Sequence, residues 1–108
     1  MVYAEPNNTS ELTEALQGGG KQLVYLTATW CGPCRQIAPH FTKASDDAAN
    51  ASIKFFKVDI DKCNDHPIVK DVTGVPTFIA LHNGTQIDVF SGANLTRLNT
   101  LVAKLVAA

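Results

Sequence analysis

The chain has 108 residues, a length typical of one domain, which we place at residues 1–108. Its composition, 45% hydrophobic and 18% charged, excludes a disordered chain, and its net charge of −1 gives no reason to expect nucleic acid or an anionic membrane as a partner. No apolar run reaches the roughly 18 residues of a membrane span. The N-terminus lacks the regions of a signal peptide, so if Met1 is the true start we expect a cytoplasmic protein.

The first half of the chain begins with a short edge strand and a helix. Residues 2–4 favour the strand, and a polar cap within residues 8–10 starts the helix, which ends at the glycines of 18–20. The run 22–28 is largely apolar, as expected of a central strand buried on both faces.

A second helix is predicted from Pro33 to residue 49 or 50. Pro39 lies inside it, removes one backbone hydrogen bond and should kink the helix. A third strand follows at 53–58, and a short helix is expected at about 65–70.

The last third of the sequence indicates a hairpin and a helix. The strands 77–82 and 86–90 flank an Asn-Gly turn at 83–84 and therefore run antiparallel. Apolar residues recur at helical spacing over 95–106, behind Asn94 as the cap. This order of elements predicts an α/β protein with a central mixed β-sheet flanked by helices on both faces.

The candidate chemistry lies between the strand 22–28 and the helix after it, in the run Trp30, Cys31, Gly32, Pro33 and Cys34. Backbone N–H groups at a helix N-terminus stabilise an anion, so we expect Cys31 to be an exposed nucleophilic thiolate and Cys34 the resolving thiol. Gly32 allows close approach of a partner chain, and Pro33 suits the first helical turn. The spacing predicts a reversible dithiol/disulfide pair.

Cys63 is the third cysteine and leaves more than one interpretation open. With His66 it forms Cys-X-X-His, which together with Cys31 and Cys34 gives a zinc-like ligand count. The rival hypothesis is therefore a structural metal domain, but Gly-Pro between the first pair favours redox chemistry and no metal. Cys63 is otherwise interpreted as a partly exposed loop thiol, with regulation by glutathionylation or a dimer disulfide as the alternative.

The run from Trp30 to Cys34 resembles the active site of the thioredoxin family. The similarity reaches from about residue 20 to the end of the chain, through the segments 28–35, 37–39, 57–61, 74–78, 83–84 and 91–94. The resemblance implies a thioredoxin fold and a protein-disulfide reductase. In that activity Cys31 attacks a substrate disulfide, and Cys34 then resolves the mixed disulfide.

The resemblance also implies how a substrate docks. The bond before Pro76 is expected to be cis and to face the disulfide, which leaves the backbone of Val75 free to pair with an extended substrate segment. A flat apolar patch suits many substrates, because it offers area and backbone contacts. The substrate-binding residues implied are Trp30, Ile60, Val75, Pro76, Gly92 and Ala93.

Tyr25 departs from the family pattern. Thioredoxins usually carry a buried Asp at this position, and that Asp is generally assigned as the proton acceptor for the resolving cysteine. The matching lysine is present as Lys57. A phenol with a pKa of about 10 is a poor base near neutrality. We therefore predict slower release by Cys34, or a proton route through water or Lys57; alternatively, Lys57 simply reaches solvent along its stem.

The resemblance implies no bound cofactor and a monomer. The oxidised pair is expected to be recharged by thioredoxin reductase, so NADPH and FAD act indirectly. Substrates would be disulfide-containing proteins such as peroxiredoxins, methionine sulfoxide reductases or ribonucleotide reductase. Two alternatives remain open, a thiol oxidant or isomerase on the same fold and a non-catalytic binding module.

Overall fold

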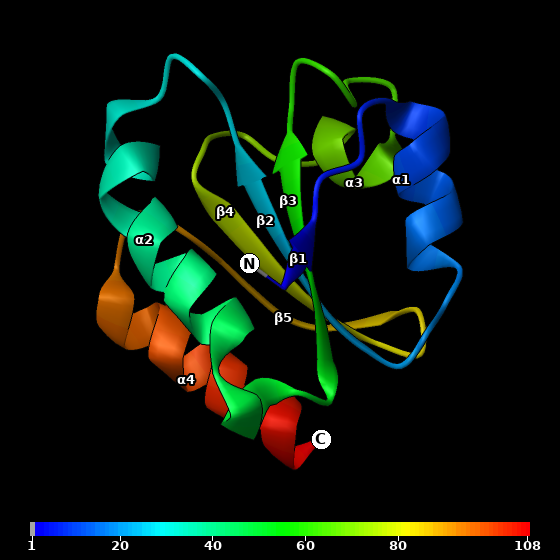
Figure 1. Cartoon of the computed structure of the whole chain (residues 1–108). Helices are drawn as coiled ribbons and strands as arrows, with labels where there is room; N and C mark the ends of the chain where they lie inside the picture. Colours follow the sequence, from blue (N-terminus) through cyan, green and yellow to red (C-terminus); the bar gives the residue numbers. More distant parts are fainter. Residues whose placement is uncertain (1) are drawn as a thin grey trace.

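The computed structural model describes residues 2–108, and within them five strands form one sheet (Figure 1). The elements in chain order are β1 (Tyr3–Ala4), α1 (Thr9–Leu16), β2 (Lys21–Thr27), α2 (Gly32–Asp46), the short 3₁₀ helix η1 (Ala48–Asn50), β3 (Ile53–Asp59), α3 (Pro67–Lys70), β4 (Thr77–His82), β5 (Thr85–Ser91) and α4 (Leu95–Ala107).

The sheet is mixed, with strand order β1-β3-β2-β4-β5. β1, β3 and β2 are mutually parallel, whereas β4 runs antiparallel to both β2 and β5. β2 is the central strand, and its residues 22–27 are all buried, as its apolar sequence indicates. In the register of the sheet, Tyr25 lies opposite Lys57 on β3 and Phe78 on β4.

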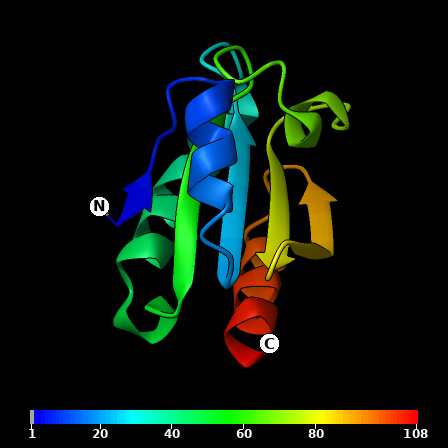
Figure 2. The same ribbon diagram turned by 90° about the vertical axis from the view of Figure 1, so that its right-hand side faces the viewer.

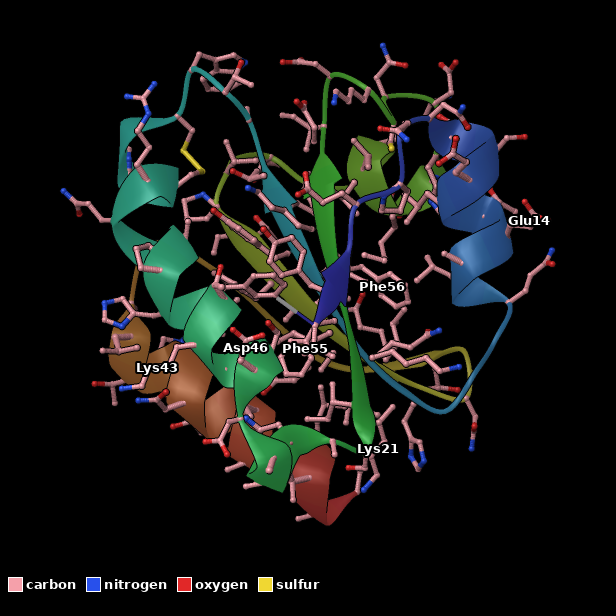
Figure 3. All side chains as sticks on the ribbon, viewed as in Figure 1. Glu14, Lys21, Lys43, Asp46, Phe55 and Phe56 are labelled. Carbon is pink, nitrogen blue, oxygen red and sulfur yellow. A yellow bond between two sulfur atoms is a disulfide. The ribbon has the colours of Figure 1, made fainter. Side chains whose placement is uncertain are left out.

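Helices cover both faces of the sheet, with α2 and α4 on one side and α1 and α3 on the other (Figures 1 and 2). Successive side chains of a strand point to opposite faces, so each face has a core of its own. Phe55 belongs to the core under α2 and α4, and Phe56 to the core under α1 and α3 (Figure 3). The predicted fold class is confirmed.

α1 begins at a cap that the sequence indicates, whereas α2 ends earlier than predicted. Asn8 starts α1 by accepting a hydrogen bond from the backbone N–H of Glu11 at 2.9 Å. α2 ends at Asp46, so the predicted end at residue 49 or 50 is wrong. The backbone of Asp47 is extended, and its carboxylate accepts from the N–H of Ala49 at 2.9 Å, which starts η1 as a separate turn.

α3 begins later than predicted, whereas α4 begins at Leu95 behind its Asn94 cap, as predicted. α3 begins at Pro67 rather than residue 65, because the imidazole Nδ1 of His66 caps it by accepting from the N–H of Ile68 at 3.1 Å. In α4 the apolar stripe is buried, but Leu95 in its first turn is 39% exposed. None of the helices within residues 2–108 is long and apolar enough to cross a membrane.

Candidate active site

The Cys31–Cys34 pair lies where β2 ends and α2 begins, and the structure shows it as a disulfide (the yellow bond in Figure 3). Their Cα atoms are 5.3 Å apart. Cys31 is the N-cap of α2, and its Sγ accepts a hydrogen bond from the backbone N–H of Cys34 at 3.2 Å. The sulfur of Cys31 therefore occupies the position at which a helix N-terminus stabilises a thiolate.

Both cysteines are buried in this oxidised form. Cys31 is 4% exposed and Cys34 is 2% exposed, so the expectation of an exposed Cys31 is wrong for this state. The cause is local packing: Ile60 and Val75 lie against the cluster that the two cysteines form with Ala28. Two of the residues predicted for substrate docking thus contact the disulfide cluster directly.

Trp30 is the large exposed side chain beside the disulfide, with 64% of its surface accessible. Its indole N–H donates to the Asp61 carboxylate at 3.0 Å. The loop that carries Asp61 is held to β2 by a hydrogen bond from the N–H of Ile60 to the carbonyl of Thr27 at 2.9 Å. Sequence reasoning missed Asp61, although it lies in the segment 57–61 that resembles the family.

The peptide bond between Val75 and Pro76 is cis, as the resemblance implies. Pro76 itself is buried, so it adds little docking surface. Its carbonyl accepts from the N–H of Gly92 at 2.9 Å, which ties the exposed Ala93 and its loop to the site. Gly92 has a φ of 111°, a conformation that side chains disfavour, so this loop needs glycine.

Tyr25 is fully buried beneath α2. Its hydroxyl donates to the backbone carbonyl of Cys34 at 3.0 Å. Its ring stacks on Phe78 at 4.9 Å and packs at an angle against Phe41 at 4.8 Å. Burial raises the pKa of the phenol above its ordinary value of 10.0, so the hydroxyl stays protonated near neutrality. This hydrogen bond links Tyr25 on β2 to the first turn of α2.

Lys57 is half-buried beside Tyr25, and its ammonium lies 5.9 Å from the ring centroid of Tyr3. That geometry suits a cation–π contact. A cavity of about 340 Å³ opens next to these residues, lined among others by Tyr25, Cys34 and Lys57. Cys34 therefore borders a cavity lined by both polar and apolar groups.

Cys63 is fully buried, so the expectation of a partly exposed loop thiol is wrong. It packs in the core under α1 and α3, and its thiol lies 3.8 Å from the carbonyl oxygen of Pro6. Burial, followed by the charges of Asp59 and Glu11, raises the pKa of this thiol. A protonated, covered thiol is a poor target for oxidation, which weighs against the regulatory alternative.

The zinc alternative has no ligand set within residues 2–108. No three His, Cys, Asp or Glu side chains lie together there as a metal site requires. His66 is engaged as the cap of α3, and Cys31 and Cys34 are bonded to each other.

Known proteins similar to this chain are thioredoxins. The family model described as Thioredoxin matches residues 4–106. A Dictyostelium discoideum protein provisionally named thioredoxin-5 is 50% identical over 105 residues, 97% of this chain and 100% of that protein. Thioredoxin-3 of the same organism is 46% identical over 99 residues, covering 91% of this chain and 92% of the relative. Horse (Equus caballus) thioredoxin is 38% identical over 99 residues, 90% and 92% of the two chains.

Solved structures agree with these relatives. Malassezia sympodialis thioredoxin superimposes with a TM-score of 0.86 at 29% identity, covering 96% of this chain and 90% of the other. A chain from a structure of the thiol resolving mechanism in yeast mitochondrial 1-Cys peroxiredoxin via glutathione/thioredoxin systems gives a TM-score of 0.82 at 30% identity, with 94% of each chain covered.

A cysteine pair that caps a helix at the end of a central strand, next to an apolar surface, defines a thiol-disulfide oxidoreductase. The family match and the relatives make the assignment more specific. The chain belongs to the thioredoxin family, whose members reduce protein disulfides with such a pair, and it is a protein-disulfide reductase.

Proposed function

We propose that Cys31 is the attacking thiolate and Cys34 the resolving thiol of this reductase. The observation that carries the proposal is the hydrogen bond from the N–H of Cys34 to Sγ of Cys31, at 3.2 Å. A sulfur that accepts a backbone N–H at a helix N-terminus is stabilised as an anion, whereas Cys34 lies one turn further in. Cys31 attacks a substrate disulfide, and Cys34 then displaces the substrate from the mixed disulfide.

The oxidised pair is then recharged by a thioredoxin reductase, which takes electrons from NADPH through FAD. Family membership supports this step, because such recharging is standard for thioredoxins. The chain acts as an electron carrier between the reductase and disulfide proteins. It binds neither NADPH nor FAD itself.

The substrates we propose are disulfide-containing proteins, among them peroxiredoxins, methionine sulfoxide reductases and ribonucleotide reductase. We propose that the protein acts on them as a monomer in the cytoplasm. The similarity to a chain from a yeast peroxiredoxin system supports the first of these classes. The exposed Trp30, with Ile60 and Val75 against the disulfide cluster, offers them an apolar surface.

Single cysteine variants test the two roles. Reduced Cys34→Ser protein, mixed with a disulfide-bonded peptide, should accumulate a covalent mixed disulfide that mass spectrometry detects. Cys31→Ser should form none and should lose turnover with NADPH and thioredoxin reductase. Cys63→Ala, which leaves both roles in place, is the matched control and should turn over like the wild type.

The same experiment distinguishes the alternatives. If Cys31→Ser traps the peptide and Cys34→Ser does not, the roles are reversed. If the wild type binds the peptide but never reduces it, the chain is a binding module and the proposal is wrong. Faster oxidation of dithiols than reduction of disulfides would indicate an oxidant.

A further inference from the structure

The cavity beside Cys34 contains two carboxylates that the sequence resemblance does not assign. It lies on the α2 side of the sheet, where β2 and β3 end, and has a volume of about 340 Å³. Polar groups line it and it has room for several water molecules. Its lining includes Glu5, Tyr25, Cys34, Lys57 and Asp59.

Resolution of the mixed disulfide requires Cys34 to lose its proton. Cys34 is 2% exposed, so bulk water does not reach the thiol freely. The nearest titratable hydroxyl, on Tyr25, already donates to the backbone carbonyl of Cys34, and burial raises the pKa of that phenol. Tyr25 therefore cannot take the proton, and the acceptor must lie elsewhere on the cavity.

Asp59 is the better placed of the two carboxylates. It ends β3 opposite Thr27, two residues after Lys57, so its side chain leaves the same face of the sheet as Tyr25 and Lys57. It is half-buried, and its Oδ1 is held by a hydrogen bond from the N–H of Asp61 at 2.8 Å. Glu5, by contrast, is exposed and lies outside the helices and strands.

We infer that Asp59 accepts the proton of Cys34 through water in this cavity, in place of the buried carboxylate that Tyr25 replaces. The inference rests on the proposed roles of the two cysteines. The Cys34 thiol gives its proton through water to Asp59, and the thiolate forms a bond to Sγ of Cys31. The bond between Cys31 and the substrate sulfur breaks, and the leaving substrate thiolate takes a proton from solvent.

The charged and titratable groups that face Cys34 and Asp59 around the cavity come from every neighbouring element. They are Glu5 before α1, Tyr25 on β2, Arg35 on α2, Lys57 on β3 and Lys62 after β3. The three cations favour the thiolate that proton transfer leaves at Cys34. Among the charged groups, the two carboxylates are proton acceptors, whereas the lysine and arginine cations are donors, so Asp59 and Glu5 are the candidates for the role.

The test separates attack from resolution. An excess of reduced protein is mixed in a stopped-flow instrument with 2,2′-dithiodipyridine, which releases one chromophoric thiopyridone when Cys31 attacks and a second when Cys34 resolves. Asp59→Asn keeps an Oδ1 acceptor for the N–H of Asp61, so the turn after β3 is retained. We expect an unchanged first phase and a second phase slowed about 100-fold at pH 7. The slowing should diminish as the pH rises, because hydroxide can then take the proton of Cys34 directly.

Two variants serve as controls. Asp65→Asn makes the same charge change at an exposed loop residue outside the cavity and should leave both phases unchanged. Glu5→Gln removes the rival carboxylate and should also leave the second phase unchanged. A second phase of wild-type rate and pH profile in Asp59→Asn overturns the inference, as does the slowing in Glu5→Gln. A first phase slowed equally in Asp59→Asn would mean a structural role and would also overturn it.

The proposed cysteine roles fail in a different way. If the wild type releases no thiopyridone in a fast first phase, the proposed roles are wrong whatever Asp59 does. If the wild type shows both phases and Asp59→Asn matches it, only the role of Asp59 is lost.

Discussion

Replacing Tyr25 with phenylalanine should destabilise the protein modestly while keeping its fold. The change removes the hydroxyl that donates to the Cys34 carbonyl at 3.0 Å and leaves the ring contacts with Phe41 and Phe78 in place. A buried hydrogen bond of this kind contributes about 1 kcal/mol. For a domain of this size, that loss corresponds to a fall in melting temperature of roughly 4–6 °C.

Tyr25→Asp, which restores the usual family residue, should cost considerably more. It removes a fully buried ring, a change of the kind that typically costs about 3–5 kcal/mol, and it buries a carboxylate in the same space. Urea unfolding of the oxidised protein, followed by far-UV circular dichroism, measures both variants. The reasoning is refuted if Tyr25→Asp is as stable as the wild type, or if Tyr25→Phe costs as much as Tyr25→Asp.

Three further predictions follow from groups around the site. Burial lowers the pKa of His66 below its ordinary 6.5, so its contribution to stability is complete above about pH 6.5 and is lost as the pH falls through the lowered value. The free energy of unfolding should fall less from pH 7 to pH 5 in His66→Asn than in the wild type, because the asparagine side chain still caps α3. An equal fall in the two proteins would contradict this. Iodoacetamide should alkylate Cys63 at least about 100-fold more slowly in the native reduced protein than in the urea-unfolded protein, because the thiol is buried and its pKa is raised. Peptide mapping measures both rates, and similar rates would refute the burial of Cys63. Asp61→Ala should raise the KM for a protein disulfide about fivefold, equivalent to roughly 1 kcal/mol, because it frees the side chain of Trp30. Asp61→Asn keeps the hydrogen-bond acceptor, so its KM should stay near the wild-type value. Equal effects of the two changes on KM would refute the role of the hydrogen bond.

Local patterns were sufficient to predict most of the fold. The apolar run of β2 and the stripe of α4 each reflect burial within one segment, so periodicity identifies them. The Asn-Gly turn is identified by residue type, because Asn and Gly tolerate the positive φ that both residues adopt there. The end of α2 was harder to predict, because the carboxylate of Asp47 competes for a backbone N–H and starts η1. α2 therefore ends at Asp46, three or four residues before the predicted end.

The site was only partly predictable for a related reason. The cysteine pair lies within one turn of chain, so its spacing is readable. The Trp30–Asp61 hydrogen bond joins residues 31 positions apart, and the cavity that brings Asp59 near Cys34 forms only when β2, β3 and α2 pack together. The burial of Cys63 likewise depends on α1 packing over a loop that has no periodicity of its own.

The reduction potential of the Cys31–Cys34 pair tests the assignment as a reductase most directly. It is measured by equilibrating the protein with a dithiol buffer and following the fluorescence of Trp30, which lies beside the pair. A reductase of this family should give a value near −270 mV. A value between about −180 and −120 mV would indicate an isomerase or an oxidant and would contradict the account.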